Sequence, residues 1–391
     1  MPRKYLETHP WINFTVDTRR AGIATWLLLG EAQSKCEHVA RALLDPRTAE
    51  ELHTVYLAKG AFATTAIEGN TLTEDQVKLH LAGKLELPKS KEYLKNEVDN
   101  IITACNAIVK EQIGGARSPL TIDEIKRYNS LVLYGLPKED DVVPGEMRLH
   151  GVTVGRYRGA PSEDCPYLLD KLCTMLEDDF SLGGSWPIAT GILKAILAHL
   201  YIAWIHPFGD GNGRTARLVE FKLCISAGVP TPAAHLLSNH YNETRTAYYS
   251  ALEQTSKNKT PFPFIEYALQ GYVDQLGEQI SKIRQVQHKA FWTNFVHLQF
   301  QKRDGAAHKR RRDLILDLSE KTFGNEEWVA TSEVATISGR LRIMYSAMTP
   351  KAIARDVNAL VDMGLLQHKR GKVRPRFSMI EAYLPKQVRQ D

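Results

Sequence analysis

The sequence predicts a mainly α-helical protein that carries one short β-hairpin and ends in a small α+β domain. Three observations support this fold class. Runs with helical spacing of apolar residues, separated by glycine, proline and capping signals, recur from residue 19 to residue 303. Valines alternate next to glycines within 149–157, as in a short hairpin. After residue 308 the pattern changes to short helices followed by a basic, glycine-containing hairpin.

The composition of the 391-residue chain is typical of a soluble globular protein, with 43% hydrophobic and 24% charged residues. This length predicts two or three domains. The net charge of +5 is uneven, because residues 308–391 contain 16 Lys and Arg against 10 Asp and Glu. Any attraction to nucleic acid is therefore expected in the C-terminal segment.

The cysteines and the apolar runs predict a cytoplasmic protein. The five cysteines are scattered, odd in number and without a CxxC pair, so neither a disulfide framework nor a zinc site is expected. The N-terminus lacks the apolar segment of a signal peptide. The most apolar stretch, 189–205, carries Lys194 and His199 and is short for a membrane span. We interpret it as a buried helix and expect no membrane partner.

The N-terminal third is predicted to be helical. One helix is expected over 19–44, before the break at Asp45-Pro46, and a second over 48–68. Gly69-Asn70 then suits the left-handed end of a helix. More helix follows within 71–113.

The middle of the chain continues the helical pattern around the hairpin. Thr121 and Glu124 form a capping box that begins a helix reaching Val132. Helices are expected over 167–180 and 187–205, on the far side of the hairpin at 149–157. This hairpin has two interpretations, a functional element or a surface loop.

The most informative stretch is His206–Arg217, which joins two predicted helices. The Gly-Asn-Gly of residues 211–213 lets backbone N–H groups turn toward an anion, at the positive end of the next helix. Arg214 and Arg217 share a helical face and can reach the same anion. Asp210 suits a Mg²⁺ that is bound to phosphates, and His206 is a candidate general base. The stretch therefore predicts a polyphosphate site, and the alternative is a glycine-rich turn with surface arginines.

These twelve residues match the Fic family signature, H-P-F-x-[D/E]-G-N-G-R-x-x-R, at every fixed position, so the chain resembles a Fic protein. The resemblance implies a protein adenylyltransferase that moves AMP from ATP·Mg²⁺ to a Ser, Thr or Tyr hydroxyl of a target protein or of itself. His206 would act as the base, Asn212 would position the α-phosphate, and Asp210 would hold Mg²⁺. ATP contacts are implied for Asp210, Gly211, Asn212, Gly213, Arg214, Thr215, Ala216 and Arg217.

The resemblance also suggests a function for a second stretch, Thr64 to Asn70. Taken alone, it is a helix end with a solvated Glu68. It is similar to the family's inhibitory motif, [S/T]-x-x-x-E-[G/N], with Thr64, Glu68 and Gly69 at the specified positions. The resemblance implies that Glu68 pairs with Arg217 and competes there with the γ-phosphate of ATP.

Other residues are assigned by position in the family. The hairpin resembles the flap that covers the nucleotide and aligns the target segment by strand pairing. Residues Val154, Gly155, Arg156 and Tyr157 would border the nucleotide there. Tyr248 or Tyr249 would contact adenine, and the alternative is that both belong to the core.

The C-terminal pattern resembles a winged helix-turn-helix. Thr349-Pro350 begins a helix that extends to Val361, and a basic hairpin follows at 367–376. Such a domain binds DNA or serves as a protein-interaction or dimerisation module, and both remain open. The predicted segments are an N-terminal helical region with the inhibitory motif (1–110), a catalytic core (111–280), a linker helix (281–308) and a winged-helix-like domain (309–391).

Two alternatives to adenylyl transfer stay open. The same residues would serve removal of AMP, with Glu68 helping to activate water. The chain would otherwise be a DNA-binding regulator in which the core senses a nucleotide. A homodimer is also compatible with the sequence.

Overall fold

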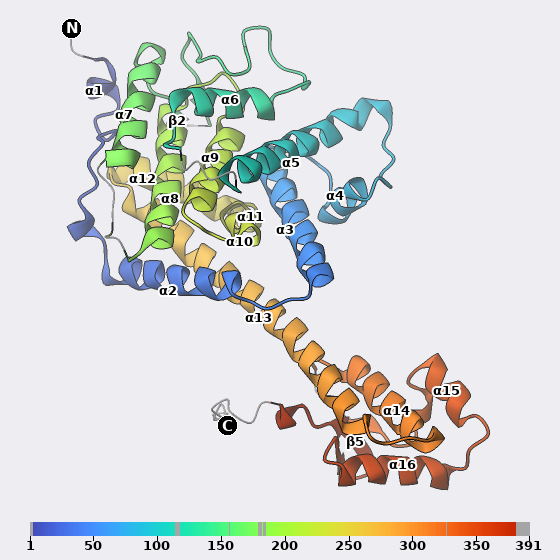
Figure 1. Cartoon of the computed structure of the whole chain (residues 1–391). Coiled ribbons are helices and arrows are strands. Elements are labelled where there is room, and N and C mark those ends of the chain that lie inside the picture. Colours follow the sequence, from blue (N-terminus) through green and yellow to red (C-terminus); the bar gives the residue numbers. More distant parts are fainter. Residues whose placement is uncertain are drawn as a thin grey trace. The chain divides into compact units, whose positions relative to one another are not determined.

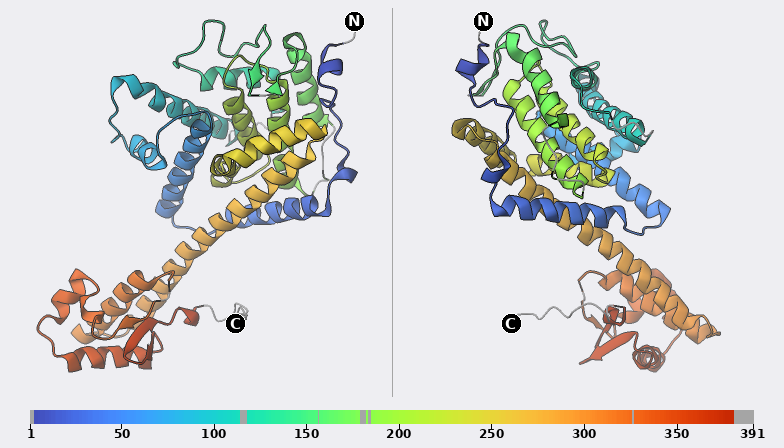
Figure 2. Two further views of the ribbon diagram at one scale, coloured as in Figure 1. Left: turned by 180° about the vertical axis from the view of Figure 1, so that it is seen from behind. Right: turned by 60° about the vertical axis from the view of Figure 1, so that its left-hand side comes forward.

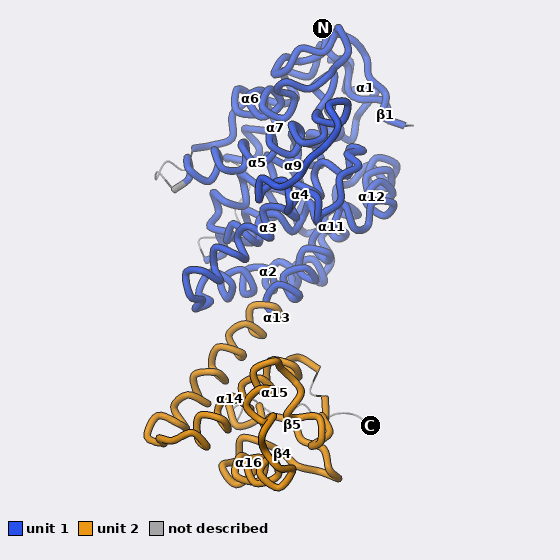
Figure 3. Tube along the Cα trace, turned by 90° about the vertical axis from the view of Figure 1, so that its right-hand side faces the viewer, with its two compact units in different colours: residues 1–280 blue, residues 281–391 orange. Residues whose placement is uncertain are grey.

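The computed structural model describes residues 3–380 except 114–117, 156, 179–181, 183–184 and 326. The chain forms two compact units, Met1–Ile280 and Ser281–Asp391 (Figure 3). The predicted mainly helical fold class is confirmed. Among the described residues, β structure consists of one two-stranded and one three-stranded antiparallel sheet and an isolated bridge between Met147 and Phe208.

The first unit is built from helices and one hairpin (Figure 1). Its helices are α1 (Tyr5–Thr8), α2 (Ile23–Ala40), α3 (Pro46–Ile67), α4 (Glu74–Leu81), α5 (Glu92–Ile113), α6 (Ile122–Val132), α7 (Cys165–Asp178), α8 (Pro187–Ile205), α9 (Asn212–Ser226), α10 (Thr231–Ala234), α11 (Leu236–Glu243), α12 (Arg245–Asn258) and the first part of α13 (Phe262–Phe300). The hairpin consists of β1 (Thr153–Val154) and β2 (Tyr157–Arg158).

Helix α8 lies at the centre of this unit because it is apolar on every side. It begins with Pro187 at its first turn and ends at Ile205, where the predicted helix also ends. Of the described helices, α8 is long and apolar enough to cross a membrane, but 83% of its apolar window is buried inside the protein. It is therefore the core helix that its sequence predicts.

Helix α9 packs along α8 at very short range. A methyl group on Gly191 of α8 would lie 2.1 Å from the Cβ of Ala227, just beyond the end of α9. Helices α5 and α6 pack against α9, and α2 and α7 pack against α8 (Figures 1 and 2). The loop between α8 and α9 is thus supported from several sides.

Local signals in the sequence set the ends of the supporting helices. The Asp45 side chain accepts a hydrogen bond from the Thr48 N–H at the start of α3, and Pro46 occupies the first helical position. Helix α3 ends at Ile67, and Gly69 follows with φ +102°. The predicted capping box at Thr121 begins α6.

The second unit has its own core. It contains the rest of α13, α14 (Ala306–Thr322), β3 (Val329–Ala330), α15 (Gly339–Tyr345), α16 (Pro350–Asp362), β4 (Leu366–Lys369) and β5 (Lys372–Pro375). Strand β5 lies between β3 and β4, and both pairs are antiparallel. The predicted helix and basic hairpin are present as α16 and β4–β5.

Two helices differ from the expectation. The predicted linker helix begins at residue 281, but in the structure this segment continues α13 from Phe262 without interruption, since no proline lies within 264–300. The segment predicted as a linker helix contributes Trp292, Val296 and Phe300 to the second core. The basic stretch at 308–312 lies inside α14, where Arg310 and Arg311 pair with the buried Asp356 of α16.

Candidate functional site

The loop from α8 to α9 begins with His206 in a left-handed conformation. Its φ is 52° and its ψ is 60°, and its N–H donates to the Ile202 carbonyl. Phe208, which is 1% exposed, anchors the loop in the core as an apolar residue. An isolated β-bridge joins Phe208 to Met147, so the segment before the hairpin pairs with this loop.

Two asparagines hold the loop in shape. The Asn212 side chain accepts from the Phe208 N–H at 2.9 Å and donates to the Phe208 carbonyl at 2.8 Å. Asn129 of α6 donates to the Asp210 carbonyl at 2.9 Å and accepts from the Gly145 N–H at 2.9 Å. The sequence suggested that Asn212 positions a phosphate oxygen. In this structure both ends of its amide are hydrogen-bonded to the backbone of Phe208, so the side chain also fixes the loop.

The N-terminus of α9 points its first-turn N–H groups out of the helix. Gly211 precedes the helix with φ 75° and has no side chain to cap the first-turn N–H groups, and the Asp210 side chain accepts from the Gly211 N–H at 2.5 Å. Uncapped N–H groups and the helix dipole together favour an anion. The side chains of Thr215 and Ala216 are buried, so any contact of these two residues with phosphate is limited to the backbone.

Glu68 lies against this helix end and pairs with Arg217. Its Oε1 is 2.6 Å from Nη2 of Arg217, and the same Nη2 donates to the Thr64 carbonyl at 3.1 Å. The Arg217 side chain is 1% exposed, whereas that of Glu68 is 31% exposed. A methyl group on Gly213 would lie 2.3 Å from Oε1 of Glu68. The carboxylate therefore lies against the Gly213 backbone in the first turn of α9.

Arg214 has different partners. Its Nη1 is 2.7 Å from Oε1 of Glu97 on α5, and its Nη2 is 3.3 Å from Asp210. Asn70 donates to the other oxygen of Glu97 at 2.9 Å, so the residue that ends the Thr64–Asn70 motif is tied to this pair. An open cleft of about 230 Å³ borders these groups. Its walls are formed by Glu68, Gly69, Asn70, Tyr93, Leu94, Glu97, Leu136, Pro137, Asp210 and Arg214.

The imidazole of His206 is neutral at physiological pH. Burial and, next, the positive charge of Arg148 lower the pKa of His206 to about 4, against the opposing effect of Glu68 and Asp210. A neutral imidazole can accept a proton, as the predicted base must. Burial raises the pKa of Glu68, but Arg217 outweighs it and holds the pKa of Glu68 below its ordinary value, so the pair is ionised.

The hairpin lies beside His206. Thr153 pairs with Arg158 and Val154 with Tyr157, and Gly155 has φ 57° in the turn. The Tyr157 hydroxyl donates to the Trp204 carbonyl of α8 at 2.7 Å, so its ring is attached to the helix. Val154 is 46% exposed and open to a ligand or peptide. Arg156, also predicted to border the nucleotide, lies outside the described residues.

The two tyrosines of α12 have different surroundings. Tyr248 is 4% exposed and its hydroxyl lies 2.9 Å from Nε2 of His199 in the core. Tyr249 is 44% exposed. Tyr249 is the more exposed of the two, so the core interpretation holds for Tyr248.

A Mg²⁺ ion fits this site only together with phosphates. Among the described residues no group of three or more His, Cys, Asp or Glu side chains is arranged around a possible metal position. The Asp210 side chain is 47% exposed and is a single hard oxygen donor. Because Mg²⁺ commonly takes one carboxylate and completes its shell with phosphate oxygens and water, this donor suffices for an ATP-bound ion.

Three residues that shape the site were not predicted from the sequence. Asn129, Glu97 and Arg148 each contact the loop or its arginines from another element. Asn129 is fully buried within the amphipathic helix α6. Its position as a polar residue on the apolar face of that helix is the sequence feature that could have indicated its role. Glu97 and Arg148 carry no such signal.

Comparison with known proteins identifies the domain that holds this loop. Residues 119–224 match the model of the Fic/DOC family. The chain is 28% identical over 239 residues to protein adenylyltransferase fic-1 of Caenorhabditis briggsae, and this match covers 61% of the chain and 43% of the relative. Protein adenylyltransferase Fic of Nematostella vectensis is 28% identical over 211 residues, covering 53% of the chain and 44% of the relative. The chain thus spans less than half the length of these relatives.

Solved structures share the fold. A Fic family protein from Desulfovibrio desulfuricans G20 superposes with a TM-score of 0.55 at 19% identity, covering 90% of this chain and 96% of that one. Residues 134–508 of Fic-1 from C. elegans superpose with a TM-score of 0.52 at 22% identity, covering 66% and 73%. The segment that carries His206, Asp210 and both arginines of α9 is therefore a Fic/DOC domain, within a helical fold shared with these Fic proteins.

Proposed function

We propose that this protein is a protein adenylyltransferase, which transfers AMP from ATP to a hydroxyl of a protein side chain and releases pyrophosphate. One observation carries the proposal. The neutral imidazole of His206 and the uncapped N-terminus of α9 belong to the same short loop, so a base and an anion site lie side by side. The Fic/DOC match and the names of the relatives support the same reaction.

In the proposed reaction, some residues of the site position the phosphates and His206 transfers the proton. The N–H groups at Asn212 and Gly213 and the guanidinium of Arg214 hold the phosphates, and Arg217 joins them once Glu68 leaves. The hydroxyl oxygen bonds to the α-phosphorus as the bond from that phosphorus to the bridging oxygen breaks. His206 takes the hydroxyl proton, and pyrophosphate leaves. Asp210 would hold a Mg²⁺ that offsets phosphate charge.

Glu68 restrains this reaction in the proposed mechanism. Its carboxylate lies against the Gly213 backbone and is hydrogen-bonded to Arg217. A γ-phosphate needs the same guanidinium and the same helix end. ATP must therefore displace Glu68 or bind with its phosphates shifted from the position for attack.

Label transfer from α-³²P-ATP tests the proposal. We expect Glu68→Gly to raise self-labelling or labelling of lysate proteins at least about 10-fold, because one charge-assisted hydrogen bond of about 1.5–3 kcal/mol no longer competes. Glu37→Gly on α2 is the matched control, since Glu37 is partnered by Gln33 and Arg41. Adding His206→Ala to Glu68→Gly should abolish transfer. Unchanged labelling in the first variant contradicts restraint, and persistent labelling in the double variant contradicts the base.

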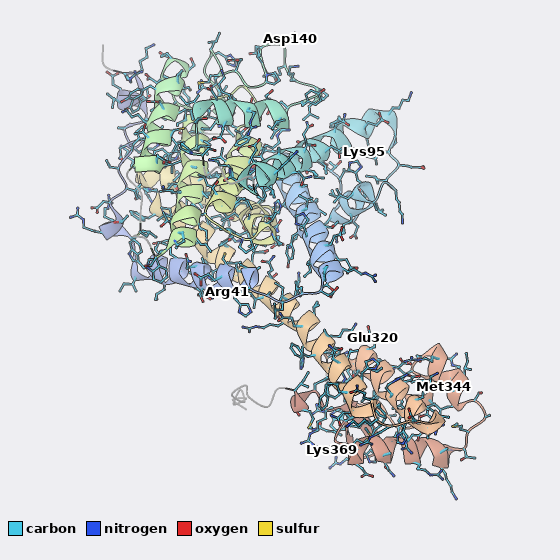
Figure 4. All side chains as sticks on the ribbon, in the orientation of Figure 1. Arg41, Lys95, Asp140, Glu320, Met344 and Lys369 are labelled. Carbon is cyan, nitrogen blue, oxygen red and sulfur yellow. The ribbon has the colours of Figure 1, made fainter. Side chains whose placement is uncertain are left out.

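A second candidate function concerns the second unit and duplex DNA. Exposed cations line the outer positions of α16 and the β4–β5 hairpin, and none has an ion pair with a described residue: Lys351, Arg355, Lys369, Arg370, Lys372 and Arg376. Lys369 lies at the edge of this unit in Figure 4. Cations without acidic partners are available to phosphates, and a helix beside a hairpin suits a groove and its backbone.

Fluorescence anisotropy with a labelled duplex tests this candidate. The apparent Kd should rise steeply with salt, and Lys369→Glu with Arg370→Glu should weaken binding at least about 10-fold. Lys282→Glu with Arg284→Glu makes the same charge change on α13 and should have a smaller effect. Equal losses in both double variants would indicate a net-charge effect and reject a specific surface.

A further inference from the structure

Arg148 is a buried guanidinium that binds main-chain carbonyls. The residue is 4% exposed. Its Nε donates to the His206 carbonyl at 2.7 Å, Nη1 to the His150 carbonyl at 2.5 Å, and Nη2 to the carbonyls of Ala160 at 2.5 Å and Ile205 at 3.4 Å. The side chain therefore joins the end of α8 to both sides of the β1–β2 hairpin.

The charge of Arg148 is compensated in an unusual way. No described carboxylate lies within ion-pair distance of it, although removing a charge from water is costly without a partner. Two of its four acceptors, Ile205 and His206, are carbonyls at the C-terminal end of α8. The last carbonyls of a helix lack intrahelical donors and carry the negative end of its dipole. Arg148 thus satisfies these carbonyls while the dipole stabilises its charge.

These bonds bear directly on the geometry of His206. A non-glycine residue in the left-handed region costs about 1–2 kcal/mol and needs support from its surroundings. The carbonyl of His206 is held by Nε of Arg148, and the Arg148 N–H donates to the next carbonyl, that of Pro207, at 3.0 Å. A methyl group on Gly159 would lie 3.0 Å from both Nη2 of Arg148 and Cβ of His206. The backbone of the hairpin base is thus packed against the histidine.

We propose that Arg148 is a positioning residue that fixes the direction of the His206 imidazole and keeps the β1–β2 hairpin in register with it. The inference rests on the proposed function, because it assigns His206 the base role. It predicts a defect in the transfer step and little change in ATP binding, since Arg148 contacts neither the α9 N-terminus nor its arginines.

Two substitutions in the Glu68→Gly background test the proposal. Arg148→Met removes the charge and all four side-chain hydrogen bonds, and we expect kcat to fall at least about 100-fold with KM for ATP within about threefold. Arg148→Lys keeps a charge but reaches fewer carbonyls, and we expect it to recover part of kcat. Arg127→Met is the control, because Arg127 pairs with the exposed Glu111 on the same unit. A kcat within threefold of the parent in both Arg148 variants would overturn the proposal, as would a loss confined to KM.

A measurement without catalysis separates this inference from the proposed function. The ¹³C-labelled His206 ring is followed by NMR during a pH titration of the otherwise unaltered protein, and His206→Ala assigns its signal. Because Arg148 contributes to the low pKa of His206, while Glu68 and Asp210 act in the opposite direction, Arg148→Met should raise that pKa and Arg148→Lys should leave it close to the parent. An unchanged titration and ring shift in both variants would reject the positioning role even if transfer is absent from every form.

Discussion

Arg214 and Arg217 lie one turn apart on α9, and a carboxylate from another part of the chain pairs with each of them. Arg217 meets Glu68, whose side chain is 31% exposed, so Glu68 can turn away toward solvent, whereas Arg217 is 1% exposed and then needs another anion. Arg214 meets Glu97, and their side chains are 8% and 10% exposed. A buried pair is costly to break, because the remaining charge is left without a partner. At the residue scale, Arg217 is therefore the arginine that can change partner, and Arg214 is the fixed one.

This difference predicts the effect of neutralising Glu97. Glu97→Gln should lower the free energy of unfolding by about 2–4 kcal/mol, since Arg214 would keep a buried charge beside an amide, with the half-exposed Asp210 at 3.3 Å as its remaining acidic partner. Glu111→Gln is the matched control, because Glu111 pairs with Arg127 at the surface and should cost at most about 1 kcal/mol. Urea unfolding followed by tryptophan fluorescence measures both. Equal costs would show that the Glu97 pair adds no more than a surface pair.

At the scale of elements, the site depends on how closely α8 and α9 pack. Helix α8 delivers His206 at its C-terminal end, and α9 presents Arg214 and Arg217 from its N-terminal turns. Gly191 permits the close approach of α8 to the end of α9. Any residue larger than glycine there must push the two helices apart.

Gly191→Ala should therefore destabilise the protein by about 1–3 kcal/mol, although alanine is the better helix former. Gly30→Ala on α2 separates the two effects, because no atom lies within 4 Å of a methyl group there. That control should be neutral or stabilising by up to about 1 kcal/mol. Thermal unfolding compares the two variants. A stable Gly191→Ala protein would mean that α8 and α9 adjust to the added methyl group.

At the scale of the whole molecule, buried neutral histidines set the response to acid. Burial and, to a lesser extent, His53 lower the pKa of His235 to about 3 from an ordinary value of 6.5. His235 is 5% exposed, and its ring stacks on Phe221 at 4.6 Å. Unfolding releases such a ring into water, where it takes up a proton below pH 6.5. The stability from the neutral ring is complete above that pH and is lost as the pH falls toward the folded-state pKa.

Between pH 6.5 and pH 5 most carboxylates stay ionised, so the histidines dominate the slope. We expect His235 to lower the free energy of unfolding by up to about 1.4 kcal/mol per pH unit in this range. His235→Gln should be less stable at pH 7 but show a shallower slope. Urea unfolding at pH 7, 6 and 5 measures both quantities. An unchanged slope would contradict a neutral buried His235.

Much of the fold and part of the site follow from local sequence. The capping box at Thr121, Asp45 before α3 and the apolar run of α8 set where helices begin or lie, because caps and periodicity act over a few residues. The linker helix predicted from residue 281 is the second part of the longer helix α13. Local composition could not show that Trp292 and Val296 of this helix belong to the second core.

The sequence by itself determined the chemistry of His206–Arg217, because twelve consecutive residues bring a base, an anion-binding helix end and two arginines together without help from the rest of the chain. It also predicted the Glu68–Arg217 contact, through the family motif at Thr64–Asn70. Only the tertiary structure decided that Glu97 fixes Arg214 from 117 residues away and that Arg148 holds the backbone of His206. Such contacts depend on which helices pack together. The sequence around a single Glu or Arg contains no motif from which its distant partner could be predicted.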